Sequence, residues 1–202
     1  MTTLIDYDAG NIKSVEKAIA YLGEEAVLTA DRDTILASDR CILPGVGNFG
    51  DAMKRLTDAG LDETIRAFAA TGKPFLGICL GLQLLFTDSE ESPGVKGLGL
   101  LPGHIVKFPE AEGLKVPQIG WNNLKLRKDV PIFRGLPEDP YVYFVHSYYL
   151  AADREEDVAA TCEYGINFHA AVASDNIYAC QFHPEKSSST GLAILKNFLS
   201  IS

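Results

Sequence analysis

The chain has 202 residues, of which 47% are hydrophobic and 22% are charged, a balance that is typical of globular proteins. This length predicts one domain, residues 1–202, with a large hydrophobic core. The net charge of −9 argues against a nucleic-acid partner, because nucleic acids are bound by a basic face.

The sequence also indicates the compartment in which the protein works. Its N-terminal residues carry no basic region followed by an apolar one, so we expect no signal peptide, and no apolar run approaches the length of a membrane span. The four cysteines have no Cys-x-x-Cys spacing, which argues against a zinc site and a disulfide framework. We therefore expect a protein of the reducing cytoplasm that does not bind a membrane.

The first half of the chain alternates short apolar runs with segments of helical periodicity. After an expected strand at Leu4 and Ile5, Asn11 is suited to cap a helix that Gly23 ends. This order of elements predicts a parallel sheet with helices on its faces. The further strands are expected at 26–28 and 41–43, and the further helices at 32–37, 51–57 and 61–70.

A glycine-rich segment, Pro44-Gly45-Val46-Gly47-Asn48-Phe49-Gly50, follows the third expected strand. Glycines at the carboxyl end of a parallel strand allow the backbone to approach a ligand closely. The segment is equally compatible with a flexible turn that only starts the next helix.

The next strand leads into Gly77-Ile78-Cys79-Leu80-Gly81. This pattern is the sulfur version of the nucleophile elbow, a sharp turn between a strand and a helix that exposes the nucleophile. The amino end of the helix would favour the thiolate form of Cys79. The pentapeptide alone does not distinguish this nucleophile from a buried core cysteine, because free cysteines are among the most buried residues.

The second half of the chain is expected to form short strands and turns after a polar surface loop at 88–97. We expect it to pack onto the first half and to end in a helix at 191–199. The expected strands are at 104–108, 121–126, 141–150, 158–162, 169–173 and 178–182.

A nucleophilic cysteine requires a base, and the base requires an orienting group. In the segment Gln181-Phe182-His183-Pro184-Glu185, the proline holds His183 in extended conformations. Residues two apart in an extended segment point to the same side, so Glu185 is expected to orient the His183 ring. A surface turn with a solvated Glu185 is the alternative. The other histidines fit this role less well. His104 is expected in a strand, His146 is expected to be partly buried among aromatic residues with its ring nitrogens satisfied, and His169 has no partner visible in the sequence.

The glycine-rich loop, the cysteine elbow and the His-Pro-Glu segment together resemble the class I (triad) glutamine amidotransferases, and the resemblance spans the whole chain. Within that class, the chain resembles the glutaminase subunits of imidazole glycerol phosphate synthase, an enzyme of histidine biosynthesis. Leu82 stands where methionine is common in these subunits, and Gln118 where histidine is common. The matching segments are 6–11, 44–49, 77–86, Gly120-Trp121-Asn122 and 182–187.

The resemblance implies a flavodoxin-like α/β fold, with a central, mostly parallel sheet flanked by helices and additional antiparallel strands in the C-terminal half. It implies a catalytic triad of Cys79, His183 and Glu185. It further assigns oxyanion donors to Leu80, Val46 and Gly47, glutamine contacts to Gln83, Ser147, Tyr148 and Gly45, and partner contacts to Asn11, Trp121, Asn122 and Lys186.

In this interpretation Cys79 hydrolyses L-glutamine through a thioester, with no cofactor or metal. The ammonia passes to a (β/α)₈-barrel cyclase subunit in a heterodimer, which produces imidazole glycerol phosphate and an aminoimidazole carboxamide ribonucleotide. Three alternatives remain from the sequence. They are a glutaminase subunit for another pathway, such as pyridoxal phosphate or anthranilate synthesis, a stand-alone cysteine hydrolase of the same fold, and a non-catalytic regulatory subunit.

Overall fold

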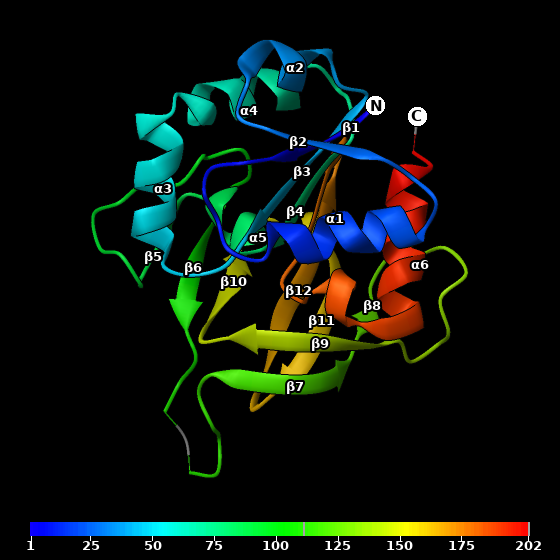
Figure 1. Cartoon of the computed structure of the whole chain (residues 1–202). Coiled ribbons are helices and arrows are strands. Elements are labelled where there is room, and N and C mark those ends of the chain that lie inside the picture. Colours follow the sequence, from blue (N-terminus) through cyan, green and yellow to red (C-terminus); the bar gives the residue numbers. More distant parts are fainter. Residues whose placement is uncertain (111, 202) are drawn as a thin grey trace.

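The structure is a computed structural model that describes residues 1–110 and 112–201 (Figure 1). Its helices are α1 (Ile12–Tyr21), α2 (Arg32–Ala37), α3 (Phe49–Asp58), α4 (Leu61–Ala69), α5 (Leu80–Leu84) and α6 (Ser188–Leu199). Its strands are β1 (Thr2–Ile5), β2 (Ala26–Thr29), β3 (Arg40–Gly45), β4 (Phe75–Cys79), β5 (Asp88–Ser89), β6 (Gly103–Lys107), β7 (Gln118–Asn123), β8 (Lys125–Leu126), β9 (Tyr141–His146), β10 (Tyr148–Ala152), β11 (Val158–Tyr164), β12 (Ile166–Ser174) and β13 (Ile177–Cys180).

The central sheet is parallel from β2 to β13 and mostly antiparallel in the remaining strands, which the C-terminal half adds. Its strands run in the order β2-β1-β3-β4-β13-β12-β10-β6-β5, and β11 and β8 join beside β12. Strands β2, β1, β3, β4 and β13 are parallel neighbours, whereas β12 is antiparallel to β13 and β10. The predicted α/β architecture is therefore confirmed.

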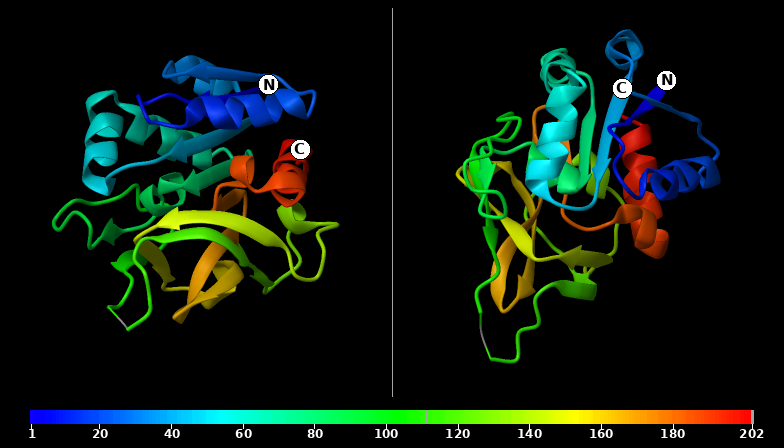
Figure 2. Two further views of the ribbon diagram at one scale, coloured as in Figure 1. Left: turned by 60° about the horizontal axis from the view of Figure 1, so that its bottom comes forward. Right: turned by 60° about the vertical axis from the view of Figure 1, so that its left-hand side comes forward.

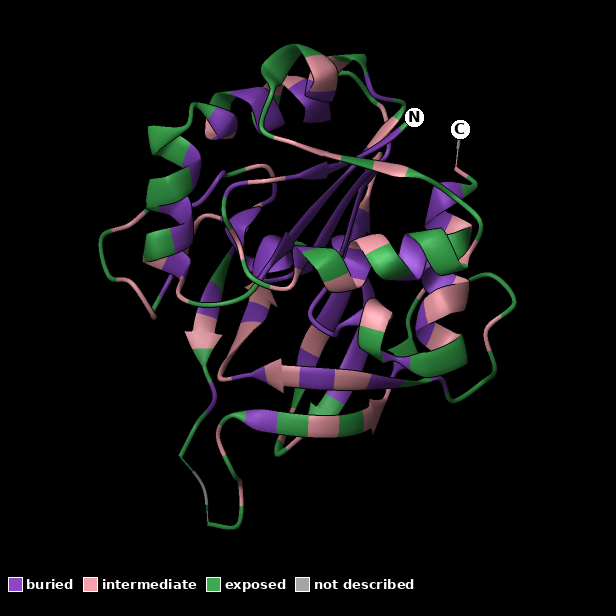
Figure 3. Cartoon of the chain, viewed as in Figure 1, coloured by how far each residue is buried: buried purple, intermediate pink, exposed green. Residues whose placement is uncertain are grey.

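Helices cover both faces of the parallel strands. Side chains alternate between the two faces along each strand, so both faces carry apolar side chains that the helices bury. Leu4 packs in the cluster that includes the apolar side chains of α1 and α6, whereas its neighbour Ile5 packs with those of α3 and α4. The right-hand view of Figure 2 places α3 and α4 on one side and α1 and α6 on the other. Figure 3 shows the central strands almost entirely buried, as expected for parallel strands covered on both faces.

Two long strands that the sequence predicts are each divided in the structure. The segment predicted as one strand at 141–150 bends at Ser147, so that β9 pairs with β7 and β10 pairs with β6 and β12. The segment predicted at 121–126 is likewise divided at Leu124, and its halves β7 and β8 lie in different sheets. A bend lets each half form its backbone hydrogen bonds with a different partner, which a single straight strand could not do.

The pairing of β4 with β13 positions the site. These strands are separated by about half the chain, yet they are parallel and in register from Phe75 opposite Ile177 to Ile78 opposite Cys180. Their carboxyl ends, which lead to Cys79 and His183, therefore meet at the same edge of the sheet. Within the described residues, none of the helices combines the length and the apolar character that crossing a membrane requires.

Candidate active site

Cys79 lies at the sharp turn between β4 and α5 that the sequence predicts. Its backbone has φ 55° and ψ −110°, a region that non-glycine residues rarely adopt and that is typical of strained functional positions. The neighbouring glycines are required by close approach. A Cβ atom on Gly81 would lie 1.9 Å from the carbonyl oxygen of Leu43, and one on Gly77 would lie 2.8 Å from the carbonyl oxygen of Gly81.

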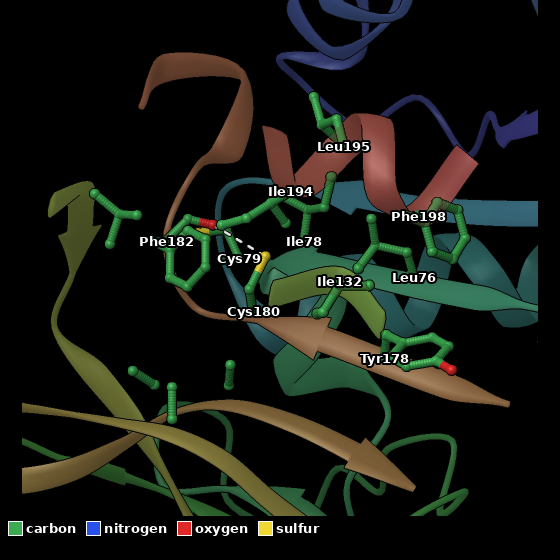
Figure 4. Close-up of a cluster of buried hydrophobic side chains, with 14 of the residues drawn as sticks. Leu76, Ile78, Cys79, Ile132, Tyr178, Cys180, Phe182, Ile194, Leu195 and Phe198 are labelled. Carbon is green, nitrogen blue, oxygen red and sulfur yellow. Dashed lines mark hydrogen bonds between the residues drawn. The ribbon is translucent and has the colours of Figure 1, made fainter. Parts of the chain in front are cut away.

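The elbow holds Cys79 at the margin of the core. Cys79 is 6% exposed and lies near Cys180 and Phe182, in a cluster with apolar side chains of β4, β13 and α6 (Figure 4). The thiol therefore borders both the hydrophobic interior and the cavity described below.

His183 and Glu185 form a buried hydrogen-bonded pair. Nδ1 of His183 lies 2.8 Å from Oε1 of Glu185, and the two side chains are 2% and 0% exposed. The predicted contact is present, but the expected geometry is wrong in one respect. The backbone is extended only at His183, and Pro184–Lys186 form a 3₁₀ turn that brings Glu185 back under the ring.

The surroundings of His183 favour its protonated form. Burial of the ring lowers the pKa of His183, but hydrogen bonds with Cys79 and Glu185 and their negative charges outweigh burial and raise this pKa to about 10. An imidazolium beside a cysteine stabilises the thiolate, which is the nucleophilic form.

A cavity of about 310 Å³ opens beside the cysteine and the histidine. It is lined by Cys79, His183 and by seven other residues to which the sequence assigns a role, namely Leu80, Val46, Gly47, Gln83, Ser147, Tyr148 and Lys186. Gly45 is outside this lining and is buried at the end of β3, where the hydroxyl of Tyr7 occupies the space that a side chain would need. A Cβ on Gly45 would lie 2.2 Å from that hydroxyl oxygen.

The segment predicted to supply oxyanion donors borders the cavity. Val46 is 38% exposed, and Gly47 has φ 106°, a conformation that side chains disfavour. The following Asn48 caps α3 by accepting a hydrogen bond from the backbone N–H of Asp51 at 3.1 Å. The segment is thus fixed at its helical end and open at the cavity.

The predicted partner-facing residues fall into two groups. Trp121 on β7 is 52% exposed and stacks edge-on against Tyr143, while Asn122 donates to the carbonyl oxygen of Glu163 at 2.8 Å. Asn11 is different, because it adopts φ 70° and does not cap α1 with its side chain as the sequence suggests. Its amide donates instead to Oε1 of Glu185 at 2.6 Å.

Two residues of the site were not identified from the sequence. Glu91 lies in the loop after β5, lines the cavity, and accepts a hydrogen bond from the backbone N–H of Phe49 at 2.7 Å. Gln181 is completely buried, and its side-chain nitrogen lies 3.7 Å from the sulfur of Cys79. Spacing in the sequence does not indicate Glu91, whereas the position of Gln181 two residues before His183 offers a signal, since both follow β13.

Comparison with known proteins places this site in a family. The model of the glutamine amidotransferase class-I family matches residues 3–201. The imidazole glycerol phosphate synthase subunit HisH of Geobacter sulfurreducens is 50% identical over 200 residues, covering 96% of each chain. The HisH subunit of Methanocaldococcus jannaschii is 47% identical over 201 residues, covering both chains completely.

Solved structures agree on the fold. A crystal structure of a glutamine amidotransferase and the structure of PurLQS from Thermotoga maritima match with TM-scores of 0.76 and 0.75, each at 20% identity and covering 98% of this chain and 96% of theirs. The full-length family match and the extent of identity lead to one conclusion: the chain belongs to the class-I glutamine amidotransferases and, within them, to the family of HisH subunits of imidazole glycerol phosphate synthase.

Proposed function

We propose that the chain is the glutaminase subunit of an imidazole glycerol phosphate synthase, in which it hydrolyses glutamine and delivers the ammonia to a separate cyclase subunit. The observation that carries the chemistry is the arrangement of Cys79 on its elbow beside the buried pair of His183 and Glu185. The membership of the HisH family supports the pathway and the partner.

In the proposed mechanism, the sulfur of Cys79 attacks the side-chain carbonyl carbon of glutamine. His183 takes the thiol proton and gives it to the departing nitrogen, which leaves as ammonia, and a γ-glutamyl thioester remains. His183 then removes a proton from water, which attacks the thioester and releases glutamate and the free thiol. Glu185 holds the ring by accepting from Nδ1 throughout.

The oxyanion that forms in both steps requires donors directed at it. The backbone N–H of Leu80 follows the nucleophile directly, which is the position that supplies a donor in nucleophile elbows. We assign the second donor to the Val46 and Gly47 segment across the cavity. Removal of one such donor typically lowers kcat by about 10²–10³-fold, so we expect a reoriented peptide in this segment to lower glutaminase activity by that factor.

Gln83 and Glu91 are suited to hold the substrate. Both side-chain N–H groups of Gln83 are used within the protein, by the carbonyl oxygen of Tyr148 at 3.2 Å and by Oε1 of Gln181 at 3.0 Å. Oε1 of Gln83 is therefore the atom available to accept from glutamine. Glu91 adds a carboxylate at the cavity wall that suits the α-ammonium group of the substrate.

The proposed docking face for the cyclase lies on the two-stranded sheet of β7 and β9. It presents exposed apolar side chains at Ile119, Trp121 and Tyr141, which are 63%, 52% and 54% exposed. Exposed aromatic side chains of this kind are typical anchors of protein interfaces. Lys186, at the cavity wall, adds a positive charge, and Asn11, which donates to Glu185 of the triad, is the remaining residue that we assign to the cyclase interface.

We further propose that residues 1–202 form one domain and that the enzyme works in the reducing cytoplasm. Both halves of the chain contribute strands to the central sheet, and each of the two hydrophobic clusters contains residues of both halves. All four cysteines, Cys41, Cys79, Cys162 and Cys180, are free and buried, and a reducing compartment keeps free thiols reduced.

The experiment is to measure glutaminase turnover of the purified chain alone, with the barrel cyclase, and with the cyclase and its ribonucleotide substrate. We expect low turnover alone and a large increase with the liganded cyclase. Cys79→Ala is the control, and it should have no turnover in any condition. High turnover alone that the cyclase leaves unchanged would refute the proposed partner and would indicate a stand-alone hydrolase.

A further inference from the structure

Gln181 is a buried amide to which the mechanism above gives no role. Its side chain is 0% exposed and lies between the cysteine nucleophile and the glutamine pocket. A buried amide is costly unless its donors and its acceptor are satisfied, so its partners indicate why it is there.

A backbone carbonyl fixes which way the amides of this region point. The carbonyl oxygen of Tyr148 can only accept, and Nε2 of Gln83 lies 3.2 Å from it, so the NH₂ group of Gln83 faces Tyr148. The same nitrogen of Gln83 lies 3.0 Å from Oε1 of Gln181 and donates to it. The oxygen of Gln181 is therefore occupied, and its NH₂ group is left to face the sulfur of Cys79 at 3.7 Å.

We propose that Gln181 is a further catalytic residue, whose side-chain N–H donates a hydrogen bond to the sulfur of Cys79 and stabilises the thiolate. This inference deepens the proposed function and rests on Cys79 being the nucleophile. Gln181 transfers no proton, because the thiol proton goes to His183 and the amide only donates a hydrogen bond.

The strength of this hydrogen bond changes with the charge on the sulfur. A thiol or thioester sulfur is a weak acceptor, whereas a thiolate is a charged and therefore strong one. The bond consequently favours the thiolate over the thiol before attack and again when the thioester is hydrolysed. His183 acts as the proton acceptor for the Cys79 thiol, so the two residues have separate roles.

The other three cysteines are buried, and burial raises their pKa values. Burial raises the pKa of Cys41 and Cys162 to about 12 and raises that of Cys180 well above its ordinary value. Cys180 lies near Cys79 (Figure 4), but its thiol donates to the carbonyl oxygen of Phe182 at 3.5 Å. Alkylation near neutral pH is therefore expected to report on Cys79 alone.

The test compares Gln181→Met with Gln118→Met in the full-length chain. Both substitutions replace a buried glutamine with an apolar side chain of similar length, but Gln118 bonds to His146 at 2.9 Å and does not contact Cys79. The readout is the rate of alkylation of Cys79 by iodoacetamide, an uncharged reagent, followed by mass spectrometry from acidic to alkaline pH without glutamine. Thermal unfolding of each variant confirms that it is folded.

We expect Gln181→Met to slow the alkylation about tenfold near neutral pH and to move its pH profile by about one unit toward alkaline pH, because a charge-assisted hydrogen bond is lost. In Gln118→Met the rate should stay within about twofold of wild type. The kcat for glutamine should fall in parallel with alkylation in Gln181→Met. An unchanged rate and profile in folded Gln181→Met would overturn the inference.

A measurement on the wild-type chain keeps the inference testable if Gln181→Met does not fold. The side-chain ¹⁵N–H signals of Gln181 should shift when Cys79 is alkylated, because the modified sulfur loses its charge, and absence of a shift would overturn the inference. The alkylation and NMR measurements use neither glutamine nor the cyclase. If Gln181→Met slows the alkylation of Cys79 but the wild-type chain never hydrolyses glutamine, the proposed function is contradicted and the role of Gln181 is not.

Discussion

His146 makes the stability of this protein sensitive to acid. Its side chain is buried against the rings of Phe108, Phe144 and Phe168, with centroids 5.1, 5.4 and 5.2 Å away. Burial lowers the pKa of His146 to about 4, a hydrogen bond to the carbonyl oxygen of Tyr148 opposes this, and the charge of His183 adds to the lowering. The unfolded chain therefore binds a proton at this residue at a higher pH than the folded chain does.

The sign and size of the effect follow from linkage. Because the folded-state pKa lies below the ordinary 6.5, the stabilisation is complete above that value and is lost as the pH falls toward about 4. Lowering the pH from about 7 to about 5 should remove about 2 kcal/mol of unfolding free energy, and further acidification should bring the loss to about 3 kcal/mol. This is a large fraction of the stability of a typical domain.

The assay is urea unfolding of wild type and His146→Phe at several pH values from about 7 to about 4.5. Phenylalanine keeps the aromatic volume but removes the partner of Oε1 of Gln118 and leaves the carbonyl oxygen of Tyr148 with only its hydrogen bond from Gln83, a cost of about 1–3 kcal/mol at every pH. Carboxylates titrate in both proteins, so the informative quantity is the difference between the two curves. That difference should shrink by about 2 kcal/mol between about pH 7 and about pH 5. Parallel curves would refute the reasoning.

Three substitutions test the site itself. Gly81→Ala should lower the free energy of unfolding by about 3 kcal/mol or more and abolish glutaminase activity, because its Cβ would lie 1.9 Å from a backbone oxygen of β3. The matched control Leu82→Met should unfold near the wild-type temperature. Glu185→Gln should lower kcat by on the order of 10²–10⁴-fold. Without the hydrogen bond and negative charge of Glu185 the pKa of His183 should fall, so the alkaline limb of the pH–rate profile should move to lower pH, and an unshifted limb would contradict this. Asn11→Gly is compatible with the left-handed backbone at this position and removes only the side-chain amide that donates to Glu185. The kcat should therefore fall about tenfold with little change in KM, and an unchanged kcat would show that this hydrogen bond does not contribute to catalysis.

The sequence predicted the elements that surround the nucleophile because their signals are local. The turn at Cys79 is identified by glycines two residues away on each side, and the structure shows that Gly81 leaves no room for a side chain. The contact of His183 with Glu185 needs only a short segment. The helical and strand periodicities of the first half likewise depend on neighbours in the chain, and the structure confirms them.

The tertiary structure decided what depends on distant partners. Only the in-register pairing of β4 with β13 brings Cys79 to His183, and a sequence does not specify which strands pair across half a chain. The bend at Ser147, the bond from Asn11 to Glu185 and the contact of Gln181 with the sulfur of Cys79 arise in the same way. In each case a polar group or a strand edge is satisfied by a partner that folding brings within hydrogen-bond distance, so the amino-acid types were readable from the sequence but their partners were not.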